Sequence, residues 1–162
     1  MKSFILRHKP KESDPQAVEN LIENTGFFND EEIKISSSLV TERLQQGEKS
    51  GYYFTFLDIE NKLSGYTCYG PIPGTASSFD LYWIGVDKDL QKEGLGTIIL
   101  EETEKEIKKM QGTHIYIETS STEKYFPTRK FYEKCKYIKE CEISDYYKTK
   151  DNLVIYSKKL AT

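Results

Sequence analysis

The chain has 162 residues, a length that fits one domain with a sizeable hydrophobic core. Its 23 basic and 26 acidic residues give a net charge of -3 at pH 7, which does not favour binding to nucleic acid. No apolar run is long enough to cross a bilayer, and the first 13 residues lack the apolar stretch of a secretory signal. We expect one cytoplasmic domain over residues 1–162, with neither a membrane nor nucleic acid as partner.

The first half of the chain predicts one strand, two helices and a hairpin. Apolar residues recur at helical spacing after Asp14, which we expect to cap the first helix, and Gly26 ends that helix. Gly47 ends the second helix. Two β-rich runs between residues 51 and 70 predict an antiparallel hairpin. The expected elements are a strand at 3–8, helices at 14–26 and 29–46, and hairpin strands within 51–70 that are joined by residues 60–62.

The second half alternates strands with two further helices. Residues 144–152, SDYYKTKDN, are polar and are expected to form a loop between the last two strands. The expected elements are strands at 79–86 and 114–119, helices at 95–110 and 127–135, and strands at 137–143 and 153–160. The resulting order, β-α-α-β-β-β-α-β-α-β-β, predicts an α/β (α+β) fold with a mixed sheet and flanking helices.

Cysteine and histidine usage argues against metal centres and disulfides. Cys68, Cys135 and Cys141 are an odd number without a CxxC spacing, so we expect buried or partly buried free thiols. His8 and His114 lie far apart and have no acidic neighbours at a ligand spacing. We expect no metal site.

The segment QKEGLG, residues 91–96, joins a β-rich run to a helical one. A helix amino terminus leaves its first N–H groups unpaired and carries partial positive charge, so a glycine turn there can hold an anion. Gly94 and Gly96 would let a ligand approach the backbone. The turn lacks the three glycines of the dinucleotide fingerprint and the GK[ST] ending of a P-loop. By itself it is equally consistent with a simple strand-to-helix connection.

The turn is more informative together with FYEK at residues 131–134. A strand, the pattern Q-x-x-G-x-G, a helix, a strand and then FYEK resembles the GNAT superfamily of N-acetyltransferases, and the order of elements matches over nearly the whole chain. The resemblance implies a GNAT-like, mostly antiparallel central sheet. Tyr125 and Thr128 depart from the usual Asn and Ala before FYEK, and Lys136 stands where a left-handed glycine is usual. Lys136 would cost on the order of 1 kcal/mol there.

The same resemblance implies that acetyl-CoA is the co-substrate. The glycine turn would hold its diphosphate, backbone groups of the preceding strand would bind pantetheine, and Tyr132 would protonate or hydrogen-bond the departing sulfur. Gly85 suits a bulge in that strand. The expected cofactor-binding residues are Ile84, Val86, Gln91, Lys92, Gly94, Leu95, Gly96, Thr97 and Tyr132.

Transfer to an amine also requires a neutral nucleophile. An alkyl ammonium with a pKa near 10.4 is rarely neutral at pH 7, so a general base should matter more than a general acid. Asp80 lies where some histone-acetylating relatives carry a catalytic glutamate, and Glu118 on the next strand is the second candidate. A water relay is a further alternative. The expected catalytic residues are Tyr132, Asp80 and Glu118.

These observations predict an N-acetyltransferase that moves an acetyl group to a primary amine of a small molecule, protein or peptide by direct attack in a ternary complex. Two alternatives stay open: an enzyme that uses another acyl-CoA, and a CoA-binding regulatory module without turnover. The family contains both monomers and homodimers, so either state is compatible with the sequence. The sequence does not identify the acceptor.

Overall fold

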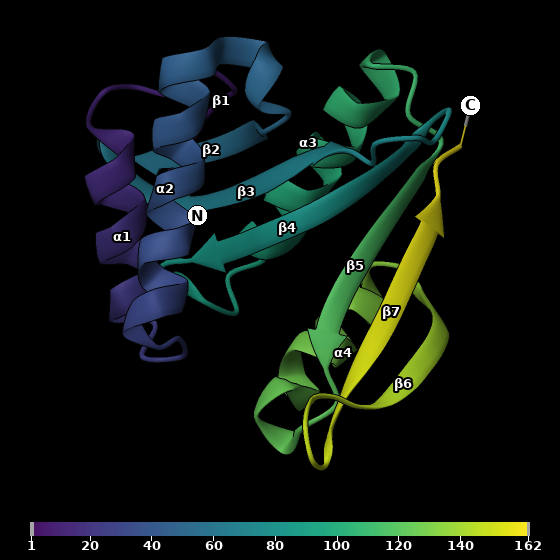
Figure 1. The fold of residues 1–162 in the computed structure, drawn as a ribbon. Helices are drawn as coiled ribbons and strands as arrows, with labels where there is room; N and C mark the ends of the chain where they lie inside the picture. Colours follow the sequence, from purple (N-terminus) through teal and green to yellow (C-terminus); the bar gives the residue numbers. More distant parts are fainter. Residues whose placement is uncertain (1, 162) are drawn as a thin grey trace. The chain divides into compact units, whose positions relative to one another are not determined.

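The computed structural model describes residues 2–161 as a mixed α/β structure with four α-helices and a seven-stranded sheet in the order β1-β2-β3-β4-β5-β7-β6 (Figure 1). Neighbouring strands are antiparallel at β1–β2, β2–β3, β5–β7 and β6–β7, and parallel at β4–β5. The helices are α1 (Asp14–Asn24), α2 (Asp30–Gln46), α3 (Leu95–Lys109) and α4 (Phe126–Lys134). The strands are β1 (Ile5–Arg7), β2 (Tyr53–Ile59), β3 (Lys62–Pro71), β4 (Ser78–Val86), β5 (His114–Ser120), β6 (Ile138–Lys148) and β7 (Asp151–Lys159).

The chain forms two compact units, which are described separately. The first comprises residues up to 70 together with 83–106, and the second comprises residues 71–82 and those from 107 onward. Strand β4 begins in the second unit and ends in the first. Whether residues 1–162 act as one domain stays a prediction.

In the first unit, helices lie on both faces of β1, β2 and β3 (Figure 1). The buried Phe54 and Phe56 of β2 belong to the core beneath α1 and α2, as the alternation of a strand requires. Their neighbours Thr55 and Leu57 meet α3 instead, where the Thr55 hydroxyl accepts a hydrogen bond from Thr103 at 3.2 Å and Leu57 packs with Ile99. These four residues of β2 are therefore part of the core.

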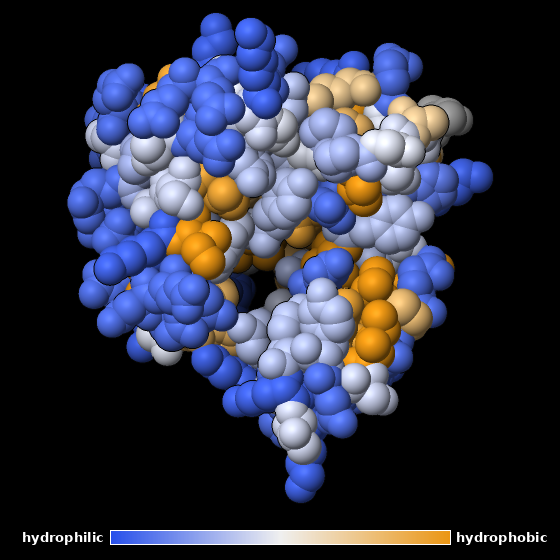
Figure 2. Space-filling view, viewed as in Figure 1, coloured by the Kyte–Doolittle hydropathy of each residue, from blue (hydrophilic) through white to orange (hydrophobic). Residues whose placement is uncertain are grey.

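The surface of α1 and α2 is mainly hydrophilic on the face drawn in Figure 2. Ile35 of α2 is an exposed apolar exception. Helix α2 begins with a reciprocal capping box between Asn29 and Glu32, in which each side chain accepts from the other residue's backbone N–H, at 2.9 and 2.8 Å. Among residues 2–161, no helix combines the length and apolar character needed to span a bilayer.

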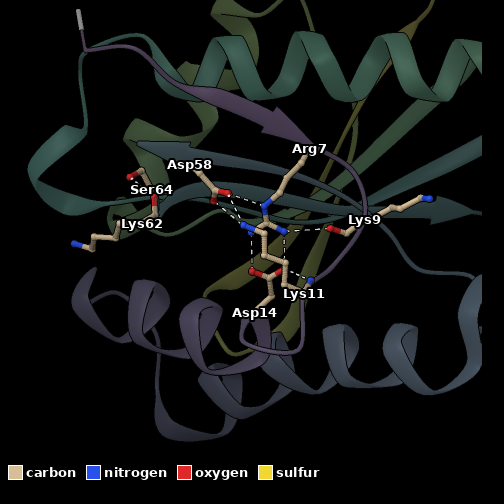
Figure 3. A network of polar contacts seen from close by, with 7 residues as sticks. All are labelled: Arg7, Lys9, Lys11, Asp14, Asp58, Lys62 and Ser64. Carbon is tan, nitrogen blue, oxygen red and sulfur yellow. Dashed lines mark hydrogen bonds and ion pairs between the residues drawn. The ribbon is translucent and has the colours of Figure 1, made fainter. Parts of the chain in front are cut away.

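Asp14 does not cap α1. Ser13 occupies the N-cap position, while the carboxylate of Asp14 accepts hydrogen bonds from both terminal nitrogens of Arg7, at 2.6 and 2.7 Å, and from the backbone of Lys11. Arg7 Nε also donates to Asp58 at 2.7 Å (Figure 3). The predicted cap is wrong because a cation from another element binds this carboxylate, and the resulting cluster ties together β1, α1 and β2.

In the second unit, β5, β7 and β6 form an antiparallel layer, and α4 lies behind β5 and β7 in Figure 1. The predicted loop at residues 144–152 is wrong, because β6 runs to Lys148 and β7 starts at Asp151. Asp145 and Lys150 have positive φ of 53° and 65°, and the Asp145 side chain accepts from Lys150 N. This polar segment therefore belongs to the two strands and the tight turn that joins them, with a register shift between Ile143 and Lys148.

The three cysteines are free thiols with different exposures. Cys68 is buried and Cys135 is partly buried, as predicted, but Cys141 is exposed. Its exposure follows from its place on β6, whose residues are all exposed. Cys141 lies between two glutamates in a predicted strand, and the sequence did not indicate that this strand is at the edge of the sheet.

Candidate active site

The glycine turn leads directly into the amino terminus of α3, in the first unit. Gly94 has φ of +83°, and a Cβ added there would have no atom within 4 Å. The first helical hydrogen bond runs from Ile98 N to Gly94 O at 3.2 Å, so the N–H groups of residues 95–97 precede the α-helical ladder. The backbone at Gly94 is thus open to a ligand, and only glycine adopts this conformation without strain.

The charge around this turn suits an anion. The first turn of α3 contains no acidic residue, so no side chain within that turn offsets the partial positive charge of the helix end, although the exposed Glu93 lies just before Gly94. Lys92, with φ of 71°, is exposed beside it. The side chain of Gln91 donates to the carbonyl of Val86 at 3.3 Å, which ties the turn to the end of β4. These features fit a phosphate-bearing group such as the diphosphate of coenzyme A.

Gly85 has a packing reason to be glycine. A Cβ there would lie 2.9 Å from Ile22 and 3.1 Å from Leu21 of α1, and 3.2 Å from the ring of Tyr66. The close approach of α1 to β4 therefore excludes a side chain at this position. The bulge expected there, and the backbone contacts of Ile84 and Val86 to pantetheine, stay predictions.

Tyr132 lies in the second unit and is buried, with 5% of its surface exposed. Its ring packs against Tyr156 and Tyr137 at centroid distances of 6.0 and 6.2 Å. Within α4, Tyr132 is more buried than its neighbour Phe131. Burial raises the pKa of the Tyr132 hydroxyl above its ordinary value, so the side chain is neutral at pH 7 and can donate a proton.

Both ends of α4 are fixed by identifiable contacts. Arg129 donates to the carbonyls of Ser120 and Thr122 at 2.7 and 2.8 Å, which anchors the helix to the end of β5. Lys136 adopts φ of 73°, as predicted from its replacement of a left-handed glycine, and Tyr137 N donates to Tyr132 O at 3.0 Å. These contacts fix the position of α4, and therefore of Tyr132, within the second unit.

Asp80 and Glu118 lie near one another in the second unit. Asp80 pairs with Tyr116 in the parallel β4–β5 register, and Glu118 follows Tyr116 by two residues on the same face of β5. Burial, followed by the charge of Glu118, raises the pKa of Asp80 above its ordinary value. Asp80 is half-buried and Glu118 is exposed, so Asp80 has the more strongly perturbed environment of the two candidate bases.

The structure thus divides the predicted site residues between the two units. Residues 84–97 belong to the first, and Asp80, Glu118 and Tyr132 belong to the second. Within the second unit, the structure brings the two carboxylates together on one face of the sheet. The individual roles assigned to all of these residues stay predictions.

Sequence reasoning missed one further cluster. His8 Nε2 lies 3.3 Å from Glu102 and 3.7 Å from Glu106. His8 therefore has acidic neighbours in space, although the sequence shows none at a ligand spacing along the chain. The two glutamates are four apart on α3 and share a helix face, but their approach to His8 depends on tertiary packing. The absence of a metal site in this protein stays a prediction.

Comparison with known proteins identifies the class defined by this fold and glycine turn. Residues 18–137 match the profile of the acetyltransferase (GNAT) family. A solved protein of the GNAT family from Desulfovibrio desulfuricans is 36% identical, with a TM-score of 0.97 over 98% of this chain and 100% of that one. The chain therefore belongs to the GNAT acetyltransferase family.

Two more distant structures share the fold. The ribosomal-protein-S18-alanine N-acetyltransferase of Escherichia coli is 19% identical, with a TM-score of 0.77 over 99% of this chain and 96% of that one. An aminoglycoside 6'-N-acetyltransferase complexed with coenzyme A is 17% identical, with a TM-score of 0.78 over 98% of both chains. No curated protein sequence matches the chain significantly.

Proposed function

We propose that the protein is a cytoplasmic N-acetyltransferase that moves the acetyl group of acetyl-CoA to a primary amine of a small molecule or peptide. The observation that carries this proposal is the α3 amino terminus, where an open Gly94 backbone and a first turn without acidic residues suit the CoA diphosphate. Gln91, Lys92 and residues 94–97 would hold the diphosphate. The family is consistent with the proposal, because one of its solved members contains coenzyme A.

Asp80 is the proposed general base. The acceptor arrives as an ammonium and first loses one proton to solvent to reach the neutral, nucleophilic form, and this is the proton that the overall reaction releases. As its nitrogen bonds to the acetyl carbon, a second proton passes to Asp80, directly or through water, and the carbon–sulfur bond breaks. A carboxylate with a raised pKa is better matched to this role than an ordinary one, which favours Asp80 over Glu118.

Tyr132 is the proposed general acid. Acetyl-CoA supplies a thioester whose leaving group is a thiolate, and a neutral tyrosine hydroxyl can protonate it to the free thiol. The position of Tyr132 within the FYEK stretch supports this role. Burial raises the pKa of the hydroxyl, which keeps it neutral but makes it a weaker acid, so it can hydrogen-bond the departing sulfur and transfers the proton only as negative charge develops there. The proton that Asp80 receives returns to solvent and the tyrosine is reprotonated from solvent, so each cycle ends with the amide, free CoA and an unchanged protein.

The test combines calorimetry with thiol release from acetyl-CoA over a panel of amines. We expect CoA binding together with amine-dependent thiol release. Binding without release for any amine would favour a regulatory module, and preferential release from a longer acyl-CoA would favour a different acyl donor. Absence of CoA binding would overturn the proposal altogether.

A matched pair of variants locates the binding site. Gly94→Leu should weaken CoA affinity by about 10-fold or more, because a side chain would occupy the space in front of the amides. Gly51→Leu is the control, since Gly51 also has positive φ, +76°, and an open Cβ position, and therefore suffers a similar backbone strain. Equal affinities for the two variants would remove the glycine turn from the site.

A further inference from the structure

Strand β6 leaves one edge of the sheet in the second unit unpaired. It pairs with β7 alone, and within residues 2–161 no strand lies along its other edge (Figure 1). All 11 of its residues, Ile138–Lys148, are exposed. A strand of this length offers a row of backbone N–H and C=O groups with which a further strand can pair. The edge is therefore a candidate interaction surface.

The side chains at the start of β6 divide between two faces. Ile138, Cys141 and Ile143 pair with every second residue of β7 and so share one face, the isoleucine face. Ile138 and Ile143 are 62% and 46% exposed on it. Lys139 and Glu142 pair with the intervening residues of β7 and share the opposite face, the lysine face, where they form an ion pair. An apolar row and a charged pair thus lie on the two faces of one edge strand.

A register shift gives this stretch a symmetrical pattern. The shift lies just before Cys141 and leaves Glu140 without a partner on β7. The Glu140 carboxylate accepts a hydrogen bond from Ser157, which pairs with Ile138, so Glu140 lies on the isoleucine face. Of residues 138–143, the second and the fifth therefore lie on the lysine face and the other four on the isoleucine face. This order is the same in both chain directions.

We propose that β6 pairs, antiparallel, with β6 of a second copy of this chain about a twofold axis at the midpoint of this symmetrical stretch. The axis is perpendicular to the sheet, so each face of one copy continues into the same face of the other. Ile138 then lies opposite the partner's Ile143, and Lys139 lies opposite the partner's Glu142. Self-pairing requires matching faces and complementary charges at equal distances from the axis, and residues 138–143 provide both. The pair uses both edges, so the assembly closes as a dimer.

The charges select this register against its neighbours. With the axis on Glu140, that carboxylate would face the same residue of the partner, and with the axis on Cys141 it would face the partner's Glu142. Both shifts put like charges opposite one another, which is destabilising, and set residues of opposite faces side by side. In the proposed register, two Lys139–Glu142 contacts join unlike charges across the axis. Charged residues that discourage other edge pairings therefore permit this one.

The test measures the mass of the protein in solution by sedimentation equilibrium for a set of charge reversals. The wild type should be dimeric. Lys139→Glu alone and Glu142→Lys alone each place like charges across the axis, so each should weaken the dimer by about 10-fold or more. Lys150→Glu is the matched control and should leave dimer affinity unchanged, because Lys150 is exposed in the turn after β6, outside the paired stretch.

An equimolar mixture of the two single variants separates this pairing from the ion pair within each chain. In a mixed dimer the Lys139→Glu chain contributes two carboxylates at these positions and the Glu142→Lys chain two ammonium groups, so both contacts are again attractive. We expect a larger share of dimer in the mixture than either variant forms alone at the same total concentration. A monomeric wild type would overturn the inference, as would variants that dimerise like the wild type or a mixture no more dimeric than its components. Acetyl transfer is measured separately by thiol release, so none of these results decides the proposed function.

Discussion

Two pairs of carboxylates in this protein have opposite electrostatic environments, since one pair has a cation beside it and the other does not. In the first unit, Asp14 and Asp58 are 2% and 7% exposed and share Arg7, which forms hydrogen bonds of 2.6 to 2.7 Å to both (Figure 3). Burial acts to lower the pKa of Arg7, but the hydrogen bonds to the two aspartates outweigh it and the pKa is raised. In the second unit, Asp80 and Glu118 have no such cation.

We interpret this difference as a structural role for Asp14 and Asp58, and it fits the catalytic role proposed for Asp80. Carboxylates that are buried with a guanidinium between them form a closed cluster with no further need for a ligand. A half-buried carboxylate such as Asp80, with the charge of Glu118 nearby and no cation beside it, costs the fold free energy in its ionised form. The first pair therefore predicts large losses of stability when it is broken, and the second predicts losses of activity.

The largest effect is expected from Arg7→Met. This change leaves Asp14 and Asp58 buried without a cation, and we expect the free energy of unfolding to fall by about 3–5 kcal/mol. The melting temperature should drop by roughly 10 °C. Thermal unfolding followed by circular dichroism measures both quantities.

Lys11→Ala provides the control for Arg7→Met. Lys11 Nζ lies 3.5 Å from Asp58, but its side chain is 59% exposed, so its removal should cost less than about 1 kcal/mol. Similar melting temperatures for Arg7→Met and the wild type would show that the Arg7 cluster is not the structural element described here.

Asp80→Asn should have the opposite pattern, with a large loss of activity and a small gain in stability. Removal of the general base should lower kcat/KM by about 100-fold or more. The raised pKa of Asp80 means that its ionised form destabilises the fold, so the neutral amide should raise the melting temperature by roughly 1 °C at pH 7. As the pH falls below 3.8, the ordinary pKa of this carboxyl, the gain should vanish, because Asp80 is then protonated in both the folded and the unfolded state.

Both halves of this prediction can be measured separately. Thiol release gives the activity, and thermal unfolding at several pH values gives the stability. Unchanged kcat/KM with an acceptor amine would exclude Asp80 as the base. A variant that is less stable than the wild type at pH 7 would contradict the unfavourable ionisation of Asp80.

The smallest effect is a shift in pH dependence for Glu118→Gln. Glu118 contributes to the raised pKa of Asp80, so its neutralisation should lower that pKa. The acid limb of the pH profile of kcat/KM, which reports the base in the free enzyme, should then move to lower pH by a fraction of a unit. An acid limb that stays in place would show that Asp80 and Glu118 are not coupled in the active protein.

The sequence predicted those features that depend on neighbouring residues. The glycine turn before α3 and the left-handed Lys136 are both local, and the order of strands and helices follows from local periodicity. FYEK and the glycine turn were sufficient to indicate the GNAT family, which the family profile confirmed.

The features that sequence reasoning missed depend on contacts between distant residues. Asp14 looked like a cap because Arg7 could not be placed beside it, and the acidic neighbours of His8 were missed because Glu102 and Glu106 lie far along the chain from it. The strand character of residues 144–148 comes from pairing with β7 in spite of their polar composition. Tertiary packing, not local propensity, decides each of these cases.

The account's central claim is that backbone amides at the start of α3 hold the diphosphate of coenzyme A. The most direct measurement is a crystal structure of the protein with coenzyme A bound. We predict that the diphosphate lies against the amides of residues 94–97, within hydrogen-bond distance. Coenzyme A bound with its diphosphate away from this turn would contradict the account.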